Sequence, residues 1–167
     1  PTSTCTTATL ASAQFVNQGT TTTVLHGNAA GNPSFGAIVS GDMNSNLTSA
    51  TITLTIDGGG SAITTGVKGT IRVPFACTIG DWYLLAPIQS GSIVIDVWKD
   101  TYANFPPTVA DTIAGTEKPT LSAAQSNRDT ALSTWTTAVA ADDIIIFNVD
   151  SAATVTLVNL TIKCTKT

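Results

Sequence analysis

The sequence predicts an all-β protein, an antiparallel β-sandwich of the jelly-roll type preceded by an extended N-terminal arm. Three observations lead to this expectation. Short apolar stretches recur after residue 50 and are separated by turn-forming residues. Several of these stretches alternate apolar and polar residues, as half-buried strands do. No part of the chain keeps helical periodicity for three turns.

Residues 1–49 differ in composition from the rest of the chain, and this composition predicts an extended arm. They are rich in Thr, Asn, Gly and Ala, and their only charged residue is Asp42. Their apolar residues come in short bursts, which include Phe15, Val16, Leu25 and Phe35. Such a segment cannot bury a core of its own. We therefore expect residues 1–49 to be an attachment arm that needs a partner surface, with disorder as the alternative, and residues 50–167 to be the sandwich domain.

The first half of the domain predicts four strands. Residues 51–56 alternate strictly, with Ile and Leu on one face and Thr on the other. Residues 67–76 and 77–85 form two more strands, and Pro74 indicates an edge or a bulge in the first of them. Residues 92–99 form a strong strand, in which Ile93, Ile95 and Val97 share one face.

A long excursion follows and is predicted to be irregular. It spans residues 100–130, and three prolines break any sheet pattern there, at positions 106, 107 and 119. Residues 108–113 are expected to make one helical turn after the first two prolines. Loops of this length are often functional.

The last part of the chain predicts three more strands. Residues 131–137 read as a short strand. Residues 144–149 are apolar in succession, which is typical of a strand buried on both faces. Residues 154–166 form the last strand, where the apolar residues change phase and so predict a bulge near Leu157 and Val158.

Composition excludes several classes of protein. Eleven acidic and seven basic residues give a net charge of −4, and charged residues make up only 11% of the chain. Seven cations do not make a nucleic-acid surface, and no apolar run is long enough to insert into a membrane. A hydrophobic content of 43% also excludes an acidic disordered tail.

The cysteines and the N-terminus suggest a cytosolic origin. Cys5, Cys77 and Cys164 have neither the number nor the spacing of a disulfide framework or a metal site, and they read as small apolar residues. A bridge between Cys77 and Cys164 is left open. The first residues lack a secretory pattern, and a leading Pro fits the removal of an initiator Met. We therefore expect a complete small protein that is synthesised in a reducing compartment.

Residues able to do acid–base or metal chemistry are scarce. His26 is the only histidine, and we expect a structural role for it. Asp96, Asp100 and Asp111 lie near Trp98 and could act as paired carboxylates on a glycan. Calcium binding by the first two, or by the adjacent pair at 142–143, is another alternative. The simpler interpretation is that these carboxylates cap turns and accept hydrogen bonds. We expect no catalytic residue, metal or cofactor.

Trp98, Tyr102 and Phe105 lie within eight residues of one another at the start of the excursion. Aromatic side chains on a loop can stack on sugar rings, but more often they form a small local core that fixes the loop. We favour the local core and keep glycan contact as the alternative.

The surface predicts assembly. Thr is the commonest residue, with 31 of 167 positions, and the outward strand positions are mostly Thr, Ser and Asn. Monomeric proteins usually protect sheet edges with charged residues, which this chain has in short supply. We therefore expect an oligomer whose arm docks on a neighbour or a larger assembly.

Parts of the sequence resemble the virion surface proteins of tailed bacteriophages. The resembling segments of the domain are residues 73–79, 91–100, 102–108 and 147–151, and residues 24–37 resemble linker motifs of phage fibre and tail proteins. The resemblance implies a non-enzymatic virion component, usually trimeric, and it carries over no catalytic residue.

A short arm with one domain fits a decoration (cement) or head-fibre protein better than a long tail fibre. We expect a homotrimer at the virion surface, assembled in the host cytoplasm. Its arm would bind the major capsid protein or other virion proteins through Phe15, Val16, Leu25 and Phe35. The alternative is a receptor-binding module in which Trp98, Tyr102 and Phe105 contact a host-surface glycan.

Overall fold

The computed structural model describes residues 20, 22–27, 34–88 and 90–167. Its contacts divide the chain into two units, Pro1–Met43 and Asn44–Thr167. In the first unit, β1 (Thr23–His26) and β2 (Ser34–Ala37) form an antiparallel hairpin. A short 3₁₀ turn, η2 (Ser40–Asp42), follows the hairpin.

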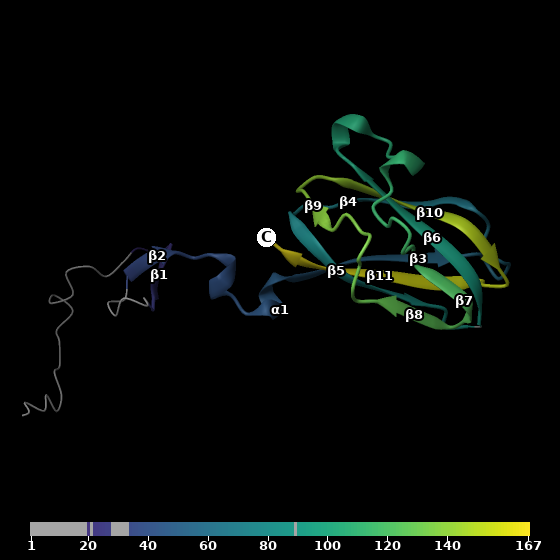
Figure 1. Ribbon diagram of the computed structural model, residues 1–167, viewed down its shortest axis with the longest axis horizontal. Coiled ribbons are helices and arrows are strands. Elements are labelled where there is room, and N and C mark those ends of the chain that lie inside the picture. Colours follow the sequence, from purple (N-terminus) through teal and green to yellow (C-terminus); the bar gives the residue numbers. More distant parts are fainter. Residues whose placement is uncertain (1–19, 21, 28–33, 89) are drawn as a thin grey trace, which may run out of the picture. The chain divides into compact units, whose positions relative to one another are not determined.

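The second unit is an antiparallel jelly roll (Figure 1). A single helical turn, α1 (Ser45–Thr48), precedes its strands. The strands are β3 (Ser49–Asp57), β4 (Gly66–Arg72), β5 (Cys77–Leu85), β6 (Gly91–Asp100), β7 (Thr120–Ala124), β8 (Ser126–Asp129), β9 (Ala138–Val139), β10 (Ile144–Ala153) and β11 (Leu157–Lys166). One sheet has the order β4-β10-β6-β7 and the other β3-β11-β5-β8, with β9 paired to β5. Most successive strands change sheet, as in a jelly roll, and the predicted fold class is confirmed.

The core lies between the two sheets and follows from the alternation in the sequence. In β3, Ile52 and Ile56 are buried while the Thr residues between them face outward. In β10, Ile145, Phe147 and Val149 are fully buried in the central cluster. Ile144 and Ile146 are buried too, although they belong to the other face of the strand. The prediction of a strand buried on both faces is therefore confirmed.

Close packing also fixes the start of β6. A Cβ atom added to Gly91 would lie 2.4 Å from the Cγ2 atom of Val155, which is fully buried. Glycine is therefore the residue that lets β6 begin beside the turn before β11.

Two parts of the predicted strand pattern are wrong between residues 100 and 137. The excursion is irregular only as far as Pro119, because β7 and β8 follow it. The sequence does not predict β7 and β8 because they are short and because Leu121 is the one side chain that they bury. Residues 131–137 form no strand. Leu132 and Trp135 are buried there from a turn, in which the Trp135 N–H donates to the Leu132 carbonyl.

The bulge expected near Leu157 and Val158 is also misplaced. β11 begins only at Leu157, and Val155 is buried from the preceding turn, where Thr154 has a φ of 65°. This turn produces the apparent change of phase. The register irregularity of β11 against β5 lies instead between Lys163 and Cys164.

We predict that Phe147→Ala destabilises the protein by about 3–5 kcal/mol, because the side chain is fully buried between the sheets. Val67→Ala is the control, since Val67 is half exposed on an edge strand and should cost less than about 1 kcal/mol. Urea unfolding of both variants measures the difference. Equal losses of stability would contradict the position of the core.

Candidate functional site: the loop between β6 and β7

The loop that leaves β6 begins with a tight, hydrogen-bonded turn. The Asp100 Oδ1 atom accepts hydrogen bonds from the backbone N–H of Thr101 at 2.7 Å and from Asn104 Nδ2 at 3.1 Å. The first of these bonds, helped by the second, lowers the pKa of Asp100 below its ordinary value. A 3₁₀ turn, η3 (Tyr102–Asn104), follows, and its last residue donates the second of these bonds. Asp100 therefore shapes the first turn of the loop.

A second turn closes on itself through a capping box. In η4 (Val109–Asp111), the Asp111 Oδ2 atom accepts from the backbone N–H of Thr108 at 2.7 Å and from its hydroxyl at 2.9 Å. The Asp111 N–H donates to the Thr108 carbonyl at 2.9 Å. The predicted helical turn after the prolines is confirmed as this 3₁₀ turn.

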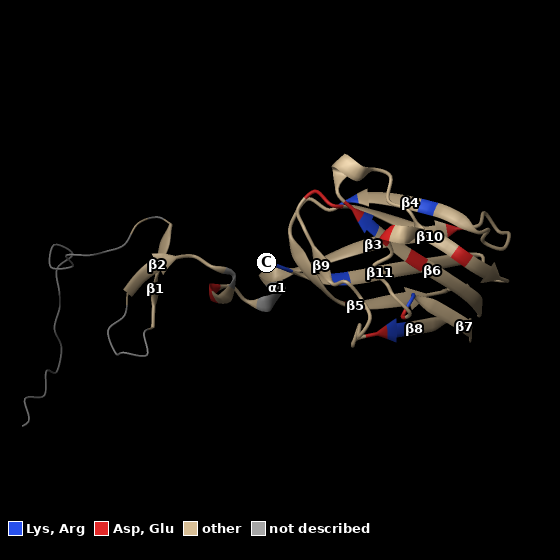
Figure 2. Cartoon of the chain, turned by 45° about the horizontal axis from the view of Figure 1, so that its top comes forward, with Lys and Arg blue, Asp and Glu red and all other residues tan. Residues whose placement is uncertain are grey.

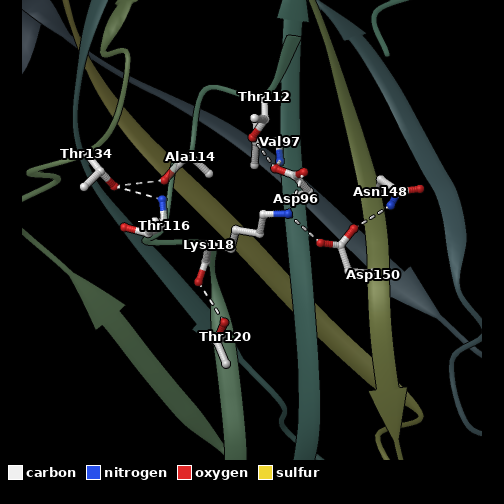
Figure 3. A network of polar contacts seen from close by, with 10 residues as sticks. All are labelled: Asp96, Val97, Thr112, Ala114, Thr116, Lys118, Thr120, Thr134, Asn148 and Asp150. Atoms are coloured by element: carbon white, nitrogen blue, oxygen red, sulfur yellow. Dashed lines mark hydrogen bonds and ion pairs between the residues drawn. The ribbon is translucent and has the colours of Figure 1, made fainter. Parts of the chain in front are cut away.

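The loop then returns along β6 and is held there by a buried carboxylate (Figure 3). Asp96 is fully buried. Its Oδ1 atom accepts from Thr112 Oγ1 at 2.5 Å and from the Val97 N–H at 2.9 Å. Its Oδ2 atom lies 2.9 Å from Lys118 Nζ. Both oxygens are thus engaged, and two of the three partners come from the loop or its end.

Lys118 joins this carboxylate to a second strand. Its ammonium also lies 2.7 Å from the Asp150 Oδ2 atom on β10, and Asn148 Nδ2 donates to Asp150 Oδ1 at 2.8 Å. The hydrogen bond to Asp150, with the charge of Asp96, raises the pKa of Lys118 above its ordinary value despite partial burial. One cation therefore ties the loop to β6 and β10 together.

Asp96 stays ionised in this network. Burial acts to raise its pKa, but the hydrogen bond from Thr112 and the hydrogen bond and positive charge of Lys118 together outweigh burial. Its pKa consequently lies below the ordinary value. The carboxylate is a fixed anion that anchors the loop.

The end of the loop is also fixed against residues 131–137. The Glu117 Oε2 atom accepts from the Thr134 N–H at 2.7 Å, and the Glu117 carbonyl accepts from Trp135 Nε1 at 3.0 Å. Gly115 has a φ of 55° and sits against the Thr134 backbone, where a Cβ atom would lie 2.6 Å from the carbonyl oxygen. The sole glutamate of the chain therefore serves as a structural acceptor.

The loop exposes apolar side chains. Tyr102 is 75% exposed, Phe105 is 55% exposed and Val109 is 64% exposed. Trp98 is half-buried on β6 and pairs with Thr112 in an isolated bridge. The favoured interpretation of the three aromatics as a local core is wrong for Tyr102 and Phe105. The loop is held by polar contacts and by Ile113 and Ala114, which are buried in the core, while these two rings stay open to solvent.

The other carboxylates considered for chemistry have partners of their own. Asp142 pairs with the exposed Arg72. Asp143 is buried, lies 2.9 Å from Lys99 Nζ and accepts from the Ala140 N–H at 2.9 Å. Across the ranges that the structure describes, no group of three or more His, Cys, Asp or Glu side chains is placed to hold a metal ion. The geometry gives the calcium and paired-carboxylate alternatives no support.

Two of the four proposed attachment residues meet in the N-terminal hairpin. Leu25 on β1 lies directly opposite Phe35 on β2, so both belong to one face of the hairpin. Leu25 is 58% exposed and Phe35 is half-buried. Phe15 and Val16 lie outside the described residues. Sequence reasoning could not foresee the pairing, because the two residues come from separate apolar bursts.

His26 closes the same hairpin onto η2. Its Nε2 atom lies 3.1 Å from Asp42 Oδ2, which also accepts from the Val39 N–H at 2.8 Å. The imidazole packs against Gly36, where a Cβ atom would meet the ring at 3.4 Å. These contacts give His26 a structural part in the first unit.

Cys77 and Cys164 lie on neighbouring strands, and both are buried free thiols. Burial raises the pKa of Cys164 to about 12, with a further contribution from its hydrogen bond with Cys77. The Cys164 thiol is therefore protonated at neutral pH and weakly nucleophilic. Cys5 lies outside the described residues.

Comparisons with known proteins identify no relative: no family model matches the chain, and no curated protein or solved structure is significantly similar to it. Among the described residues, no helix has the length and apolar character needed to cross a membrane.

We predict that Lys118→Met destabilises the protein by about 3 kcal/mol, because it leaves the buried Asp96 without its cation. Arg72→Met is the matched control. Its ion pair with Asp142 is exposed, so its loss should cost less than about 1 kcal/mol. Chemical denaturation measures both values, and similar losses would contradict the anchoring role of Lys118.

We also predict a pH dependence that Asp96→Asn reduces. A carboxylate whose pKa is lowered on folding adds stability above its unfolded pKa of about 3.9, and this stability is lost as the pH falls through the folded pKa. The free energy of unfolding of the wild type should therefore approach that of Asp96→Asn as the pH is lowered from 6 toward 3. A constant difference over this range would exclude the ionised carboxylate as its source.

Proposed function

We propose that this chain is a non-enzymatic structural protein of the bacteriophage virion surface. In this proposal it is a homotrimeric decoration protein that docks on the capsid through its N-terminal unit and stabilises the shell. The observation that carries the proposal is the apolar pair on the hairpin, in which Leu25 is exposed and Phe35 is half-buried.

The hairpin has the properties of a docking element. An isolated two-stranded sheet is marginally stable in water and needs a partner surface. Beyond the Leu25–Phe35 pair, Ile38, Val39 and Met43 are also exposed. No Lys or Arg occurs in residues 1–49. An interface formed by these residues would gain roughly 25 cal/mol for each Å² of apolar area buried.

The sandwich supports a passive role. It has a core of its own, and the carboxylates that acid catalysis would need are engaged in ion pairs or turns. Charged residues are sparse over the chain (Figure 2). A surface of this kind suits a protein that lies against other chains.

A second candidate function is host-glycan binding, and the exposed rings of Tyr102 and Phe105 favour it. Aromatic rings stack on the apolar faces of sugars, and a pre-shaped loop loses little conformational entropy on binding. The two turns closed by Asp100 and Asp111 give the loop such a shape. A decoration protein could carry both activities, because the two surfaces lie on different segments of the chain.

The docking proposal predicts that deleting residues 1–43 abolishes saturable binding to decoration-free capsids while the sandwich stays folded. A point variant sharpens the test: Leu25→Asp should weaken capsid binding at least ~10-fold, because it places a charge in an apolar interface. Val67→Asp, an equally exposed position on the sandwich, should leave binding unchanged. Co-sedimentation with capsids measures all three. Undiminished binding after the deletion would refute the proposal.

The adhesion candidate predicts that Tyr102→Ala with Phe105→Ala lowers binding to host cells or to purified surface polysaccharide by at least ~10-fold, since each stacked ring contributes on the order of 1 kcal/mol. Leu85→Ala is the control, an exposed apolar residue on β5. Equal cell binding by the double variant and the wild type would remove the loop from consideration.

A further inference from the structure

The free edges of the two sheets are protected to different degrees. Edge strands offer unpaired N–H and C=O groups to other chains, and proteins blunt them with charges, bulges or short length. Among the described strands, β4 carries Lys68 and Arg72 and has a register irregularity against β10. β7 has five residues and an irregular register with β6, and β8 has four residues that include Arg128 and Asp129. Each of these three edges has a recognisable protection.

β3 has none of these protections. It is nine residues long, contains no proline and keeps an unbroken register with β11, the only described strand that pairs with it. Its single charge, Asp57, is at its last position. Alternate residues of such a strand direct their N–H and C=O groups toward the open side. β3 is therefore a long strand, uncharged except at its last residue, with which another strand can pair.

The open side of β3 also exposes an apolar seam of the core. Leu54, Ile71 and Phe75 are only partly buried at the rim of the central cluster. A groove of about 250 Å³ lies here. It is lined by residues 51–53 of β3 and by residues 71–75, which are the end of β4 and the segment that follows it. A strand added to β3 would place its inward side chains over this seam, so backbone and apolar contacts would form together.

We propose that β3 pairs antiparallel with β3 of a second copy of the chain, around a two-fold axis at Thr53. The sequence of β3 is complementary to itself in this register. On the outer face, Thr53 meets Thr53 and Thr51 meets Thr55, and cross-strand Thr pairs are favourable. On the inner face, Ile52 meets Leu54.

The self-complementary pairing of β3, without any contact between like charges, favours a second copy as the occupant. In the proposed register Asp57 faces Ser49 of the other copy, so no like charges meet along the strand. The contact is of the isologous type, the same strand on both subunits, which closes on itself after two copies. It is independent of the proposed capsid attachment, which involves the N-terminal unit. It is also separate from the contact that would form the proposed homotrimer, because a two-fold contact joins two copies and not three.

Charged variants at Thr53 test the register directly, with the full-length chain and sedimentation velocity as the measurement. Thr53 is exposed, so Thr53→Lys and Thr53→Glu should fold normally, as circular dichroism can verify. Each variant alone should lower the association constant at least ~10-fold, because position 53 faces itself and like charges repel. An equimolar mixture of the two variants should restore association, because Lys then faces Glu.

Thr161→Lys is the control, since Thr161 lies beside Thr53 on the same face of the inner strand β11. It should leave association unchanged. A wild-type chain that stays monomeric at 100 µM overturns the proposal. So does a wild-type assembly whose size Thr53→Lys leaves unchanged, or one whose size the mixture of variants fails to restore. Capsid binding by Thr53→Lys separates the two proposals, because loss of the strand contact leaves the N-terminal unit intact.

Discussion

The buried carboxylate of Asp96 is the constraint on which the shape of the loop depends. A fully buried anion is stable only with hydrogen bonds and a nearby cation. β6 supplies one backbone N–H, and the remaining partners, Thr112 and Lys118, come from the loop that follows. The loop therefore has to return along β6 rather than extend into solvent. Since Lys118 also reaches Asp150, the same cation fixes the loop to β10.

This anchoring explains why exposed aromatic rings stand on an ordered loop. A loop held by apolar packing would bury Tyr102 and Phe105 to gain stability. Here Ile113 and Ala114 pack into the core near the end of the loop. The turn at Asp100, the capping box at Thr108 and the ion network at Lys118 fix the rest of the backbone with polar contacts instead. The two rings are therefore not needed to hold the loop in place, and a loop of fixed shape can present them to a ligand.

Periodicity predicted the parts of the fold that depend on burial. β3, β6 and β10 were found from the sequence because each has several apolar residues in a strand phase. β7 and β8 were missed because hydrogen bonds to their neighbours, rather than apolar side chains, define them. Residues 131–137 were predicted to be a strand because they contain apolar residues. They form none, because residues of a turn can also point into a core.

The candidate site was less predictable than the fold, for a related reason. Asp96 and Lys118 are 22 positions apart, and no local pattern relates a strand residue to the end of a long irregular loop. The exposure of Tyr102 and Phe105 depends on these long-range polar contacts, whereas the close spacing of the aromatic residues in the sequence favoured a local core. The cross-strand meeting of Leu25 and Phe35 likewise needed the register of the hairpin.

Both proposed contacts between chains share one physical character. The hairpin would bind through apolar side chains, and β3 would bind through backbone hydrogen bonds between uncharged residues. Neither depends on exposed ion pairs, whose contribution is small and is screened by salt. The cations of the β6 and β10 region are meanwhile occupied within the chain, where Lys118 and Lys99 neutralise buried carboxylates. A chain with so few charges can thus keep them for its own fold and assemble by contacts that ionic strength affects little.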